Sequence, residues 1–183
     1  EHRGAVGADP LAGDGAGILI QIPDAFLKDE CAKLGFKLPE AQQYAVAQLF
    51  MPQDERLDAH CRSAWERIVR EQGLELLGWR EVPVDNACLS ELVRATEPVH
   101  RQLFVARPKG ISEAEFERRL YLVRKIVSNS IINSYRGRDI GHYTVSLSSR
   151  TVVYKGMFLS YQVGAYYSDL KDPRVISAMA LVH

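Results

Sequence analysis

The sequence predicts an α+β fold in a single domain, and three observations carry that prediction. The chain has 183 residues, which is enough for one domain with a substantial core. Its apolar runs of strand length come mostly in pairs rather than in strict alternation with helices. Two long stretches with helical periodicity lie between these pairs, and they are expected to cover one face of a sheet.

The first seventeen residues are expected to form a loop, because six of them are glycine or proline. The β-branched run 18–22 ends at Pro23 and predicts a short strand that is buried on both faces. A short helix is expected over 24–33, with Asp24 as its N-cap. The run 44–51 predicts a second buried strand, which ends at Pro52.

A helical pattern extends from Asp54 to Gln72, and Gly73 follows where that helix would stop. One face of it carries a repeating set of small and apolar residues: Leu57, Cys61, Ala64 and Ile68. Two further strands are expected over 74–82 and 102–106. These two strands are the last elements expected before the long helix over 113–134.

The clearest helix is expected over 113–134. Ser112 and Glu115 have the spacing of a capping box, in which each side chain binds an amide at the other's position. An apolar stripe follows along one face: Phe116, Leu120, Val123, Val127 and Ile131. Gly137 and Gly141 end the pattern.

The last part of the chain predicts two neighbouring strands, 143–147 and 150–155, as a candidate hairpin around Ser148 and Ser149. The Asn-Gly pair typical of a tight hairpin turn does not occur there. A mostly helical stretch is expected over 157–170, and a final strand over 176–183.

Composition excludes several classes of function. The formal net charge is zero, whereas dedicated nucleic-acid binders usually carry a basic excess. No apolar run approaches the ~20 residues that cross a bilayer, so we expect neither nucleic acid nor membrane as a partner. The three cysteines are widely spaced and form no CxxC pair. We interpret them as small buried or half-buried thiols in a cytoplasmic, reducing environment: Cys31, Cys61 and Cys88.

The run Gly13-Asp14-Gly15-Ala16-Gly17 invites a nucleotide-binding interpretation. That interpretation fails because a strand is expected after the glycines, where a dinucleotide-binding loop needs a helix. We expect instead a loop that needs positive φ angles or passes close to another segment. Arg3 precedes this loop, and a guanidinium group can grip a carboxylate with two parallel hydrogen bonds. Alone, it is more typical of a surface arginine.

The sequence gives only weak indications of other catalytic or metal-binding residues. The sequence has no Gly-x-Ser-x-Gly nucleophile elbow. His60 and Cys61 are adjacent, so on a helix they point about 100° apart. His100 and His142 have no carboxylate or histidine partner at metal-ligand spacing, and no metal site is expected.

Three segments of the chain together form a pattern that is far more specific than any single motif. The first runs from His2-Arg3-Gly4-Ala5 through Ala8-Asp9 and Gly13-Asp14-Gly15-Ala16-Gly17-Ile18 to Ile22-Pro23. The second is Gly78-Trp79-Arg80-Glu81-Val82-Pro83-Val84-Asp85. The third, and the most distinctive, is Ser146-Leu147-Ser148-Ser149-Arg150-Thr151-Val152-Val153-Tyr154-Lys155-Gly156-Met157. Their order and spacing extend across nearly the whole chain, and together they resemble the glutaminase domain of glutamate synthase large subunits.

The resemblance implies an N-terminal-nucleophile hydrolase fold, a four-layer α/β/β/α sandwich that is incomplete at both ends of this chain. It implies class II glutamine amidotransfer, in which an N-terminal cysteine attacks the side-chain amide of glutamine and releases ammonia. The α-amine of that cysteine can serve as its general base. In the full enzyme, synthase domains of the same polypeptide use FMN and an iron–sulfur cluster to convert 2-oxoglutarate to glutamate. A small NADPH-binding flavoprotein subunit is a further partner that the family suggests.

The site residues carried over by the resemblance are few. Arg3 matches a family arginine that holds the glutamine substrate, with His2, Gly4 and Asp14 in the loop beside it. His183 matches the first residue of a His-Gln-Arg-Phe-Ser-Thr segment, whose arginine also grips substrate. The family's nucleophile would precede residue 1, and its oxyanion-hole residues would follow residue 183. We therefore expect residues 1–183 to be a partial type 2 glutamine amidotransferase domain that is inactive and poorly stable alone.

Two alternatives remain open. In the first, the chain is a catalytically inactive relative that serves as a scaffold or interaction module. In the second, it is another class II glutamine amidotransferase. A cysteine encoded upstream and Gln-Arg-Phe-Ser-Thr encoded downstream would favour the enzyme over the scaffold. The Ser-Leu-Ser-Ser-Arg-Thr segment favours glutamate synthase over other amidotransferases. A plastid location replaces the cytoplasm if the source is a plant or alga.

Overall fold

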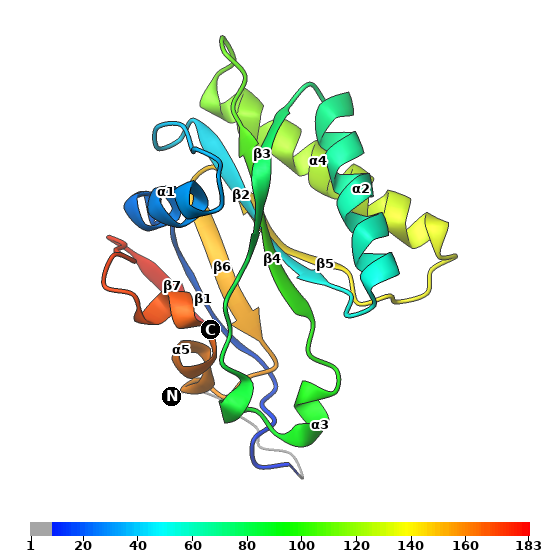
Figure 1. Ribbon diagram of the computed structural model, residues 1–183, viewed down its shortest axis with the longest axis vertical. Coiled ribbons are helices and arrows are strands. Elements are labelled where there is room, and N and C mark those ends of the chain that lie inside the picture. The colour runs from blue at the N-terminus through cyan, green and yellow to red at the C-terminus, as the bar shows by residue number, and fades with distance from the viewer. Residues whose placement is uncertain (1–8) are drawn as a thin grey trace.

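Figure 1 shows a computed structural model of the chain, which describes residues 9–183. The strands are β1 (Ala16–Gln21), β2 (Tyr44–Met51), β3 (Glu75–Glu81), β4 (Val99–Ala106), β5 (Tyr143–Ser148), β6 (Thr151–Gly156) and β7 (Ala180–Val182). The helices are α1 (Asp24–Lys33), α2 (Glu55–Glu71), α3 (Glu91–Arg94), α4 (Glu113–Ser134) and α5 (Gln162–Tyr166), with 3₁₀ turns η1 (Asn86–Cys88) and η2 (Ser168–Lys171). Two antiparallel sheets with flanking helices confirm the predicted α+β class.

The larger sheet has four strands in the order β3-β4-β2-β5. β2 is buried along almost its whole length, which confirms the prediction of a buried strand at Tyr44–Met51. α2 and α4 lie side by side on one face of this sheet (Figure 1), and their apolar stripes form one core with β2 and β4. The stripe predicted for α4 is the set of buried residues of that helix. The expectation that two long helices cover one sheet face is therefore confirmed.

Side-chain caps fix where the two long helices begin. The Asp54 carboxylate accepts hydrogen bonds from the amides of Arg56 and Leu57 at the start of α2. Ser112 Oγ accepts from the amide of Glu115, 3.1 Å away, at the start of α4. The Glu115 carboxylate itself accepts from two arginines of the next turn, Arg118 and Arg119.

The smaller sheet has the order β6-β1-β7, and a second core lies between it and the larger sheet. α1 and α5 contribute side chains to this second core. The prediction that the first strand is buried on both faces was wrong. Ala16 and Ile20 are buried, but Ile18 and Leu19 are only half-buried, because cavities lie beside them.

The predicted hairpin of β5 and β6 was also wrong, because the two strands belong to different sheets. β5 pairs with β2, and β6 pairs with β1. The chain crosses between the sheets at Ser149 and Arg150, and α4 holds this crossing. The Glu117 carboxylate accepts from the amide and the hydroxyl of Ser149, each at 2.6 Å, and Arg150 pairs with Glu113. The crossing thus depends on ion pairs and hydrogen bonds to α4 rather than on turn residues.

Three local predictions also need correction. Asp24 is the first residue of α1 rather than its cap, and its carboxylate accepts from the Tyr44 hydroxyl and pairs with Lys28. The helix expected over 157–170 is reduced to α5 and η2, because the backbone between them pairs with another segment: the Asp85 amide donates to the Tyr166 carbonyl at 2.7 Å, and Tyr167 forms a bridge with Val84. The strand expected over 176–183 is only the three residues of β7, and all three are exposed.

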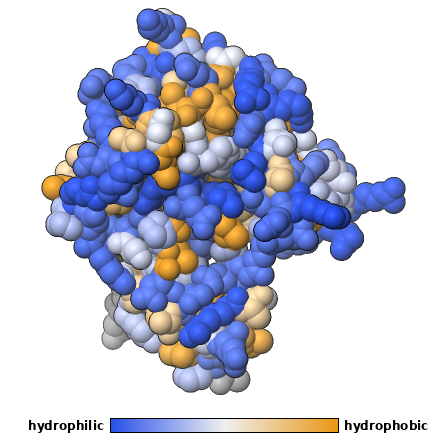
Figure 2. Space-filling model, in the orientation of Figure 1, coloured by the Kyte–Doolittle hydropathy of each residue, from blue (hydrophilic) through white to orange (hydrophobic). Residues whose placement is uncertain are grey.

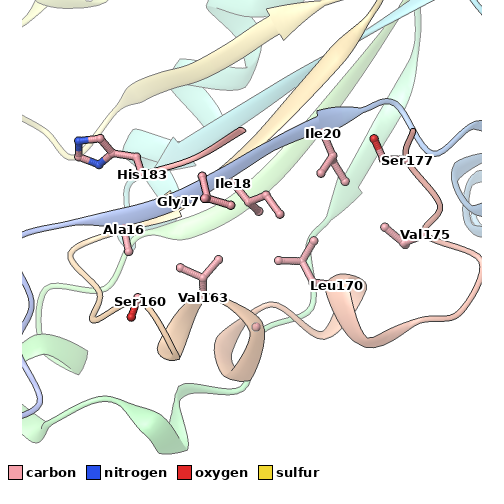
Figure 3. A pocket seen from close by; sticks show the side chains of 12 residues that line it. Ala16, Gly17, Ile18, Ile20, Ser160, Val163, Leu170, Val175, Ser177 and His183 are labelled. Atoms are coloured by element: carbon pink, nitrogen blue, oxygen red, sulfur yellow. The ribbon is translucent and has the colours of Figure 1, made fainter. Parts of the chain in front are cut away.

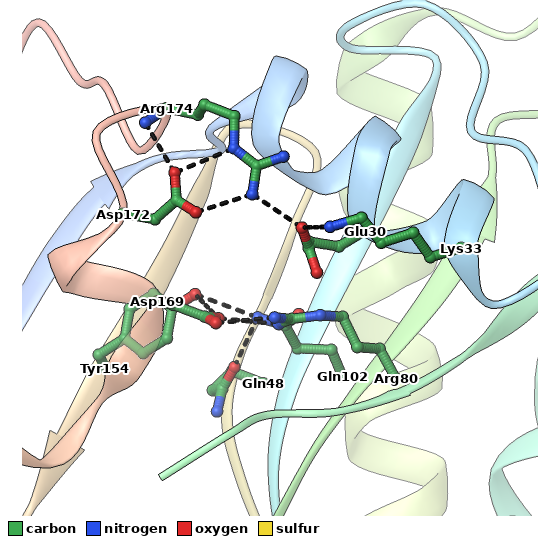
Figure 4. A network of polar contacts seen from close by, with 9 residues as sticks. All are labelled: Glu30, Lys33, Gln48, Arg80, Gln102, Tyr154, Asp169, Asp172 and Arg174. Carbon is green, nitrogen blue, oxygen red and sulfur yellow. Dashed lines mark hydrogen bonds and ion pairs between the residues drawn. The ribbon is translucent and has the colours of Figure 1, made fainter. Parts of the chain in front are cut away.

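A buried polar network joins the two sheets (Figure 4). Arg80 of β3 donates two hydrogen bonds to Asp169 of η2, at 2.8 and 2.7 Å, and both side chains are at most 5% exposed. Asp169 also accepts from the Tyr154 hydroxyl of β6 at 3.0 Å. Arg80 donates to Gln102 Oε1, and Gln102 Nε2 donates to Gln48. The interior charge is therefore paired and hydrogen-bonded on several sides.

The surface in the view of Figure 2 is mostly hydrophilic, and apolar residues appear between the polar ones as separate patches. Within residues 9–183, no helix combines the length and the apolar character that a membrane span requires.

Candidate functional site

The residues expected near substrate fall into two groups. His2, Arg3 and Gly4 lie outside the residues that the structure describes. Asp14 lies in the glycine-rich loop before β1, and His183 directly follows β7. The structure therefore describes one residue from each of the two segments that the family resemblance relates to substrate.

The glycine-rich loop owes its composition to close packing and backbone conformation. A Cβ atom at Gly13 would lie 2.1 Å from the carbonyl oxygen of Phe158, and one at Gly17 would lie 2.6 Å from Cβ of Lys155. Gly15 has a φ of +131°, which side chains rarely allow. The loop leads into β1 and not into a helix. The prediction of a loop that packs closely against another segment and uses a positive φ angle is confirmed.

Backbone hydrogen bonds bring the glycine-rich loop and the last residue of the chain together. The Gly17 amide donates to the His183 carbonyl at 3.2 Å, and the His183 amide donates to the Gly17 carbonyl at 3.1 Å. These bonds continue the antiparallel pairing of β1 with β7. Segments that are more than 160 positions apart in the sequence therefore meet at one end of the smaller sheet.

Two cavities border the Gly17–His183 pair. The first, of about 470 Å³, lies between β1, β7 and α5, and apolar side chains such as Ile18, Val163 and Leu170 line it (Figure 3). The second, of about 640 Å³, extends from Asp14 past β1 and β6 to Phe50 and Tyr143 of the larger sheet. Both volumes are in the range of small-molecule sites.

The polar groups of the second cavity are few. Asp14, Lys155 and His183 border it among mostly apolar neighbours. The Lys155 ammonium lies 4.6 Å from the centre of the Tyr143 ring and donates to its hydroxyl at 3.2 Å. This cation is thus held against an aromatic face at the cavity wall.

A tyrosine and histidine cluster supports the segment on which the glycine-rich loop packs. The Tyr167 hydroxyl donates to the Lys155 carbonyl at 2.7 Å. The Tyr166 hydroxyl donates to Glu97, so its oxygen can accept from Nε2 of His100, 2.8 Å away. The ring of Phe158 packs on both tyrosines. Sequence reasoning missed this cluster, although the adjacent pair of tyrosines within an expected helix was a signal of a buried aromatic turn.

Acidification is expected to destabilise the fold between pH 6.5 and about 4. Trp65 donates to Nε2 of His142 at 3.0 Å, which requires a neutral ring. Burial lowers the pKa of His142 to about 4, from the 6.5 of the unfolded chain. Between these values the unfolded state binds a proton that the folded state does not, so stability is lost as the pH falls. Burial lowers the pKa of His100 to about 4 as well, so this residue also contributes to the loss of stability as the pH falls.

Urea unfolding at a series of pH values measures this effect. In a His142→Gln variant the loss of stability between pH 6.5 and 4 should be smaller than in the parent protein. An unchanged slope would show that His142 is not the titrating group.

The three cysteines are buried or half-buried free thiols, as predicted. Burial raises the pKa of Cys31 and Cys61 to about 12, and it also raises the pKa of Cys88. At neutral pH these side chains are thiols and not thiolates, so they are poor nucleophiles. Within the described part of the chain, no three potential ligands form a metal-binding group. These residues therefore do not fit an iron–sulfur cluster.

Comparison with known proteins gives a consistent result. The family model for class-II glutamine amidotransferases matches residues 1–183. The glutamate synthase [NADPH] large chain of Bacillus subtilis is 40% identical over the whole of this chain, and that of Azospirillum brasilense is 39% identical. The ferredoxin-dependent glutamate synthase 2 of Synechocystis is 36% identical. The chain spans only 11–12% of the length of these relatives. Its full-length match to the family model shows that the chain belongs to the class-II glutamine amidotransferases.

Proposed function

We propose that these 183 residues are part of the glutaminase domain of a glutamate synthase. This domain hydrolyses glutamine to glutamate and ammonia, and the ammonia is then transferred reductively to 2-oxoglutarate. The observation that carries the proposal is the backbone pairing of Gly17 with His183. It joins the loop that follows Arg3 to the strand end at His183, which are the two segments that resemble substrate-gripping segments of the family.

The proposed reaction is an acyl transfer through a thioester. A cysteine encoded before Glu1 attacks the side-chain carbonyl carbon of glutamine, and its α-amine takes the thiol proton. The carbon–nitrogen bond breaks, and ammonia leaves with that proton. Water then attacks the thioester and releases glutamate, which restores the thiol. Residues downstream of His183 supply the oxyanion hole. The cavity of about 640 Å³ beside Asp14 and His183 is the space into which glutamine would extend.

Arg3 is proposed to hold the glutamine carboxylate with two parallel hydrogen bonds. In the full-length protein, Arg3→Lys should raise the KM for glutamine about 10- to 100-fold, because a charge-assisted pair contributes about 1.5–3 kcal/mol. Ammonia release measured against glutamine concentration gives this value. The exposed Arg56 on α2 provides the control, since Arg56→Lys should leave KM unchanged. Equal KM values for Arg3→Lys and the parent protein would remove Arg3 from the site.

The proposed nucleophile is none of the three cysteines of this chain. In the full-length protein, replacing Cys31, Cys61 and Cys88 together by serine should leave ammonia release from glutamine within about twofold, since burial keeps all three protonated. The matched alanine variant controls for stability, because serine would bury hydroxyl groups at Cys31 and Cys61. Loss of activity on changing one cysteine, with folding intact, would mean that this residue is the nucleophile.

The reductive half of the reaction is proposed to belong to other domains of the same polypeptide, with FMN and an iron–sulfur cluster. The names of the relatives include NADPH, NADH and ferredoxin, and a small NADPH-binding flavoprotein subunit is a proposed partner where NADPH is the donor. The proposed location is the cytoplasm, or a plastid in a plant or alga, as the name of the Arabidopsis thaliana relative includes "chloroplastic".

A further inference from the structure

The outward side of α4 carries apolar side chains that no other part of residues 9–183 covers. Tyr121, Leu122, Ile126 and Ile132 are 38–57% exposed, although the opposite side of the helix already supplies a complete buried stripe. A surface helix normally turns charged and polar residues to this side. We name these four residues, together with Lys125, the α4 outer face. A cluster of exposed apolar residues of this kind is typical of an interaction site.

The same part of the chain is strongly basic. Residues 118–138 contain six arginines and lysines and no acidic residue, although the net charge of the whole chain is zero. Arg118 and Arg119 are neutralised by Glu115. The other four cations have no carboxylate within salt-bridge distance among residues 9–183: Arg124, Lys125, Arg136 and Arg138. Positive charge beside apolar side chains requires a partner that is both acidic and apolar.

A groove lies at the end of the α4 outer face. It has a volume of about 420 Å³ and lies between the last turns of α4 and the segment that leads to β5. Ile132, Ile140 and Tyr143 provide its apolar wall. Its charged lining residues are two arginines and one carboxylate, Arg124, Arg138 and Asp139, so cations outnumber acids there. The groove has room for an apolar side chain, with cations placed to meet carboxylates beside it. Insertion of one apolar side chain into a pocket of the partner in this way anchors many protein interfaces.

We infer that the α4 outer face and this groove dock an acidic protein surface that belongs to another domain of the same polypeptide. This inference rests on the proposed function, since a longer polypeptide is part of that proposal. The relatives devote 88% or more of their length to other segments, so a neighbouring domain is always at high local concentration. Phosphates of a nucleic acid would satisfy the cations but would leave the apolar residues and the groove without partners.

Thiol labelling of the full-length protein tests the inference. Ile126→Cys places a thiol in the centre of the α4 outer face, whereas Leu34→Cys and Leu92→Cys place one at control sites, which are 55% and 73% exposed. Peptide mass spectrometry after alkylation gives the rate at each site. We expect Ile126→Cys to react at least tenfold more slowly than either control. Adding Lys125→Glu and Arg138→Glu to the Ile126→Cys variant should restore fast labelling, because the two new carboxylates would repel an acidic partner.

Three results would overturn the inference. Labelling of Ile126→Cys at the rate of the controls would show that the face is open to solvent. Protection that disappears on dilution would identify a second copy of the protein as the partner, and protection only with anionic lipid vesicles would identify a membrane. Labelling does not depend on ammonia release. An active glutaminase with an open face therefore defeats only this inference, and an inactive protein with a protected face defeats only the proposed function.

Discussion

Asp169→Ala is expected to lower the free energy of unfolding by about 3–5 kcal/mol, the cost of leaving one charge of a buried pair without its partner. Asp169 accepts two hydrogen bonds from Arg80 and one from Tyr154. Its removal leaves the Arg80 guanidinium, which is 5% exposed, without a counter-charge. Denaturant unfolding of the parent and the variant measures the difference.

Two comparisons make this prediction specific. Arg174 also binds Asp172 with two hydrogen bonds, from Nε at 3.0 Å and from Nη2 at 2.7 Å, but these side chains are 36% and 25% exposed. Asp172→Ala should therefore change stability far less than Asp169→Ala. Replacing both buried partners, with Arg80→Met and Asp169→Leu, should recover much of the loss, since no unpaired charge remains. If Asp169→Ala cost no more than Asp172→Ala, the buried network would not stabilise the contact between the sheets.

Gly13→Val is expected to reduce ammonia release by the full-length protein about 100-fold, the effect of displacing reacting groups by about 1 Å. A Cβ atom at this position would lie 2.1 Å from the Phe158 carbonyl oxygen. No rotation of a side chain relieves this contact, because the backbone fixes the position of Cβ and its partner is a backbone oxygen. The loop from Gly13 to Gly17, which is proposed to border the substrate, must then move. The measurement is kcat/KM for glutamine.

Gly164→Ala is the matched control for this change. Gly164 lies in α5, where an added Cβ meets no atom within 4 Å, and alanine favours a helix over glycine. Activity should be unchanged, with equal or slightly higher stability. Full activity of Gly13→Val would mean that the loop position does not matter to the reaction.

The elements that sequence reasoning predicted well are those whose signal is local. β2 and α4 have the predicted bounds, because a continuous apolar run and a 3.6-residue stripe are set by nearby residues. The hairpin of β5 and β6 failed because strand pairing is not local. Each strand has a distant partner, and Glu117 of α4 supplies the bonds that hold the crossing. No pattern within residues 143–155 encodes either fact.

The candidate site was predictable to a similar extent. Close packing at Gly13 and Gly17 was expected because the loop is rich in glycine. The sequence did not indicate that Phe158 and Lys155 are the residues on which they pack. The pairing of Gly17 with His183 could not be derived from periodicity, since it depends on how β7 completes the smaller sheet. Family resemblance related both segments to substrate, and only the three-dimensional arrangement shows them in contact.

The order of strands in the smaller sheet has a consequence for biosynthesis. β1 leaves the ribosome early, but Gln21 pairs with Thr151, which is synthesised 130 residues later. At 5–20 residues per second, β1 waits on the order of ten seconds for its first partner. The pairing of β2 with β4 is complete by Ala106, so three of the four strands of the larger sheet, β2, β3 and β4, can pair meanwhile. Throughout this interval the nascent chain exposes an apolar strand with two free edges, which is a template for aggregation. We therefore expect shielding of β1 by a chaperone to govern the yield of folded protein.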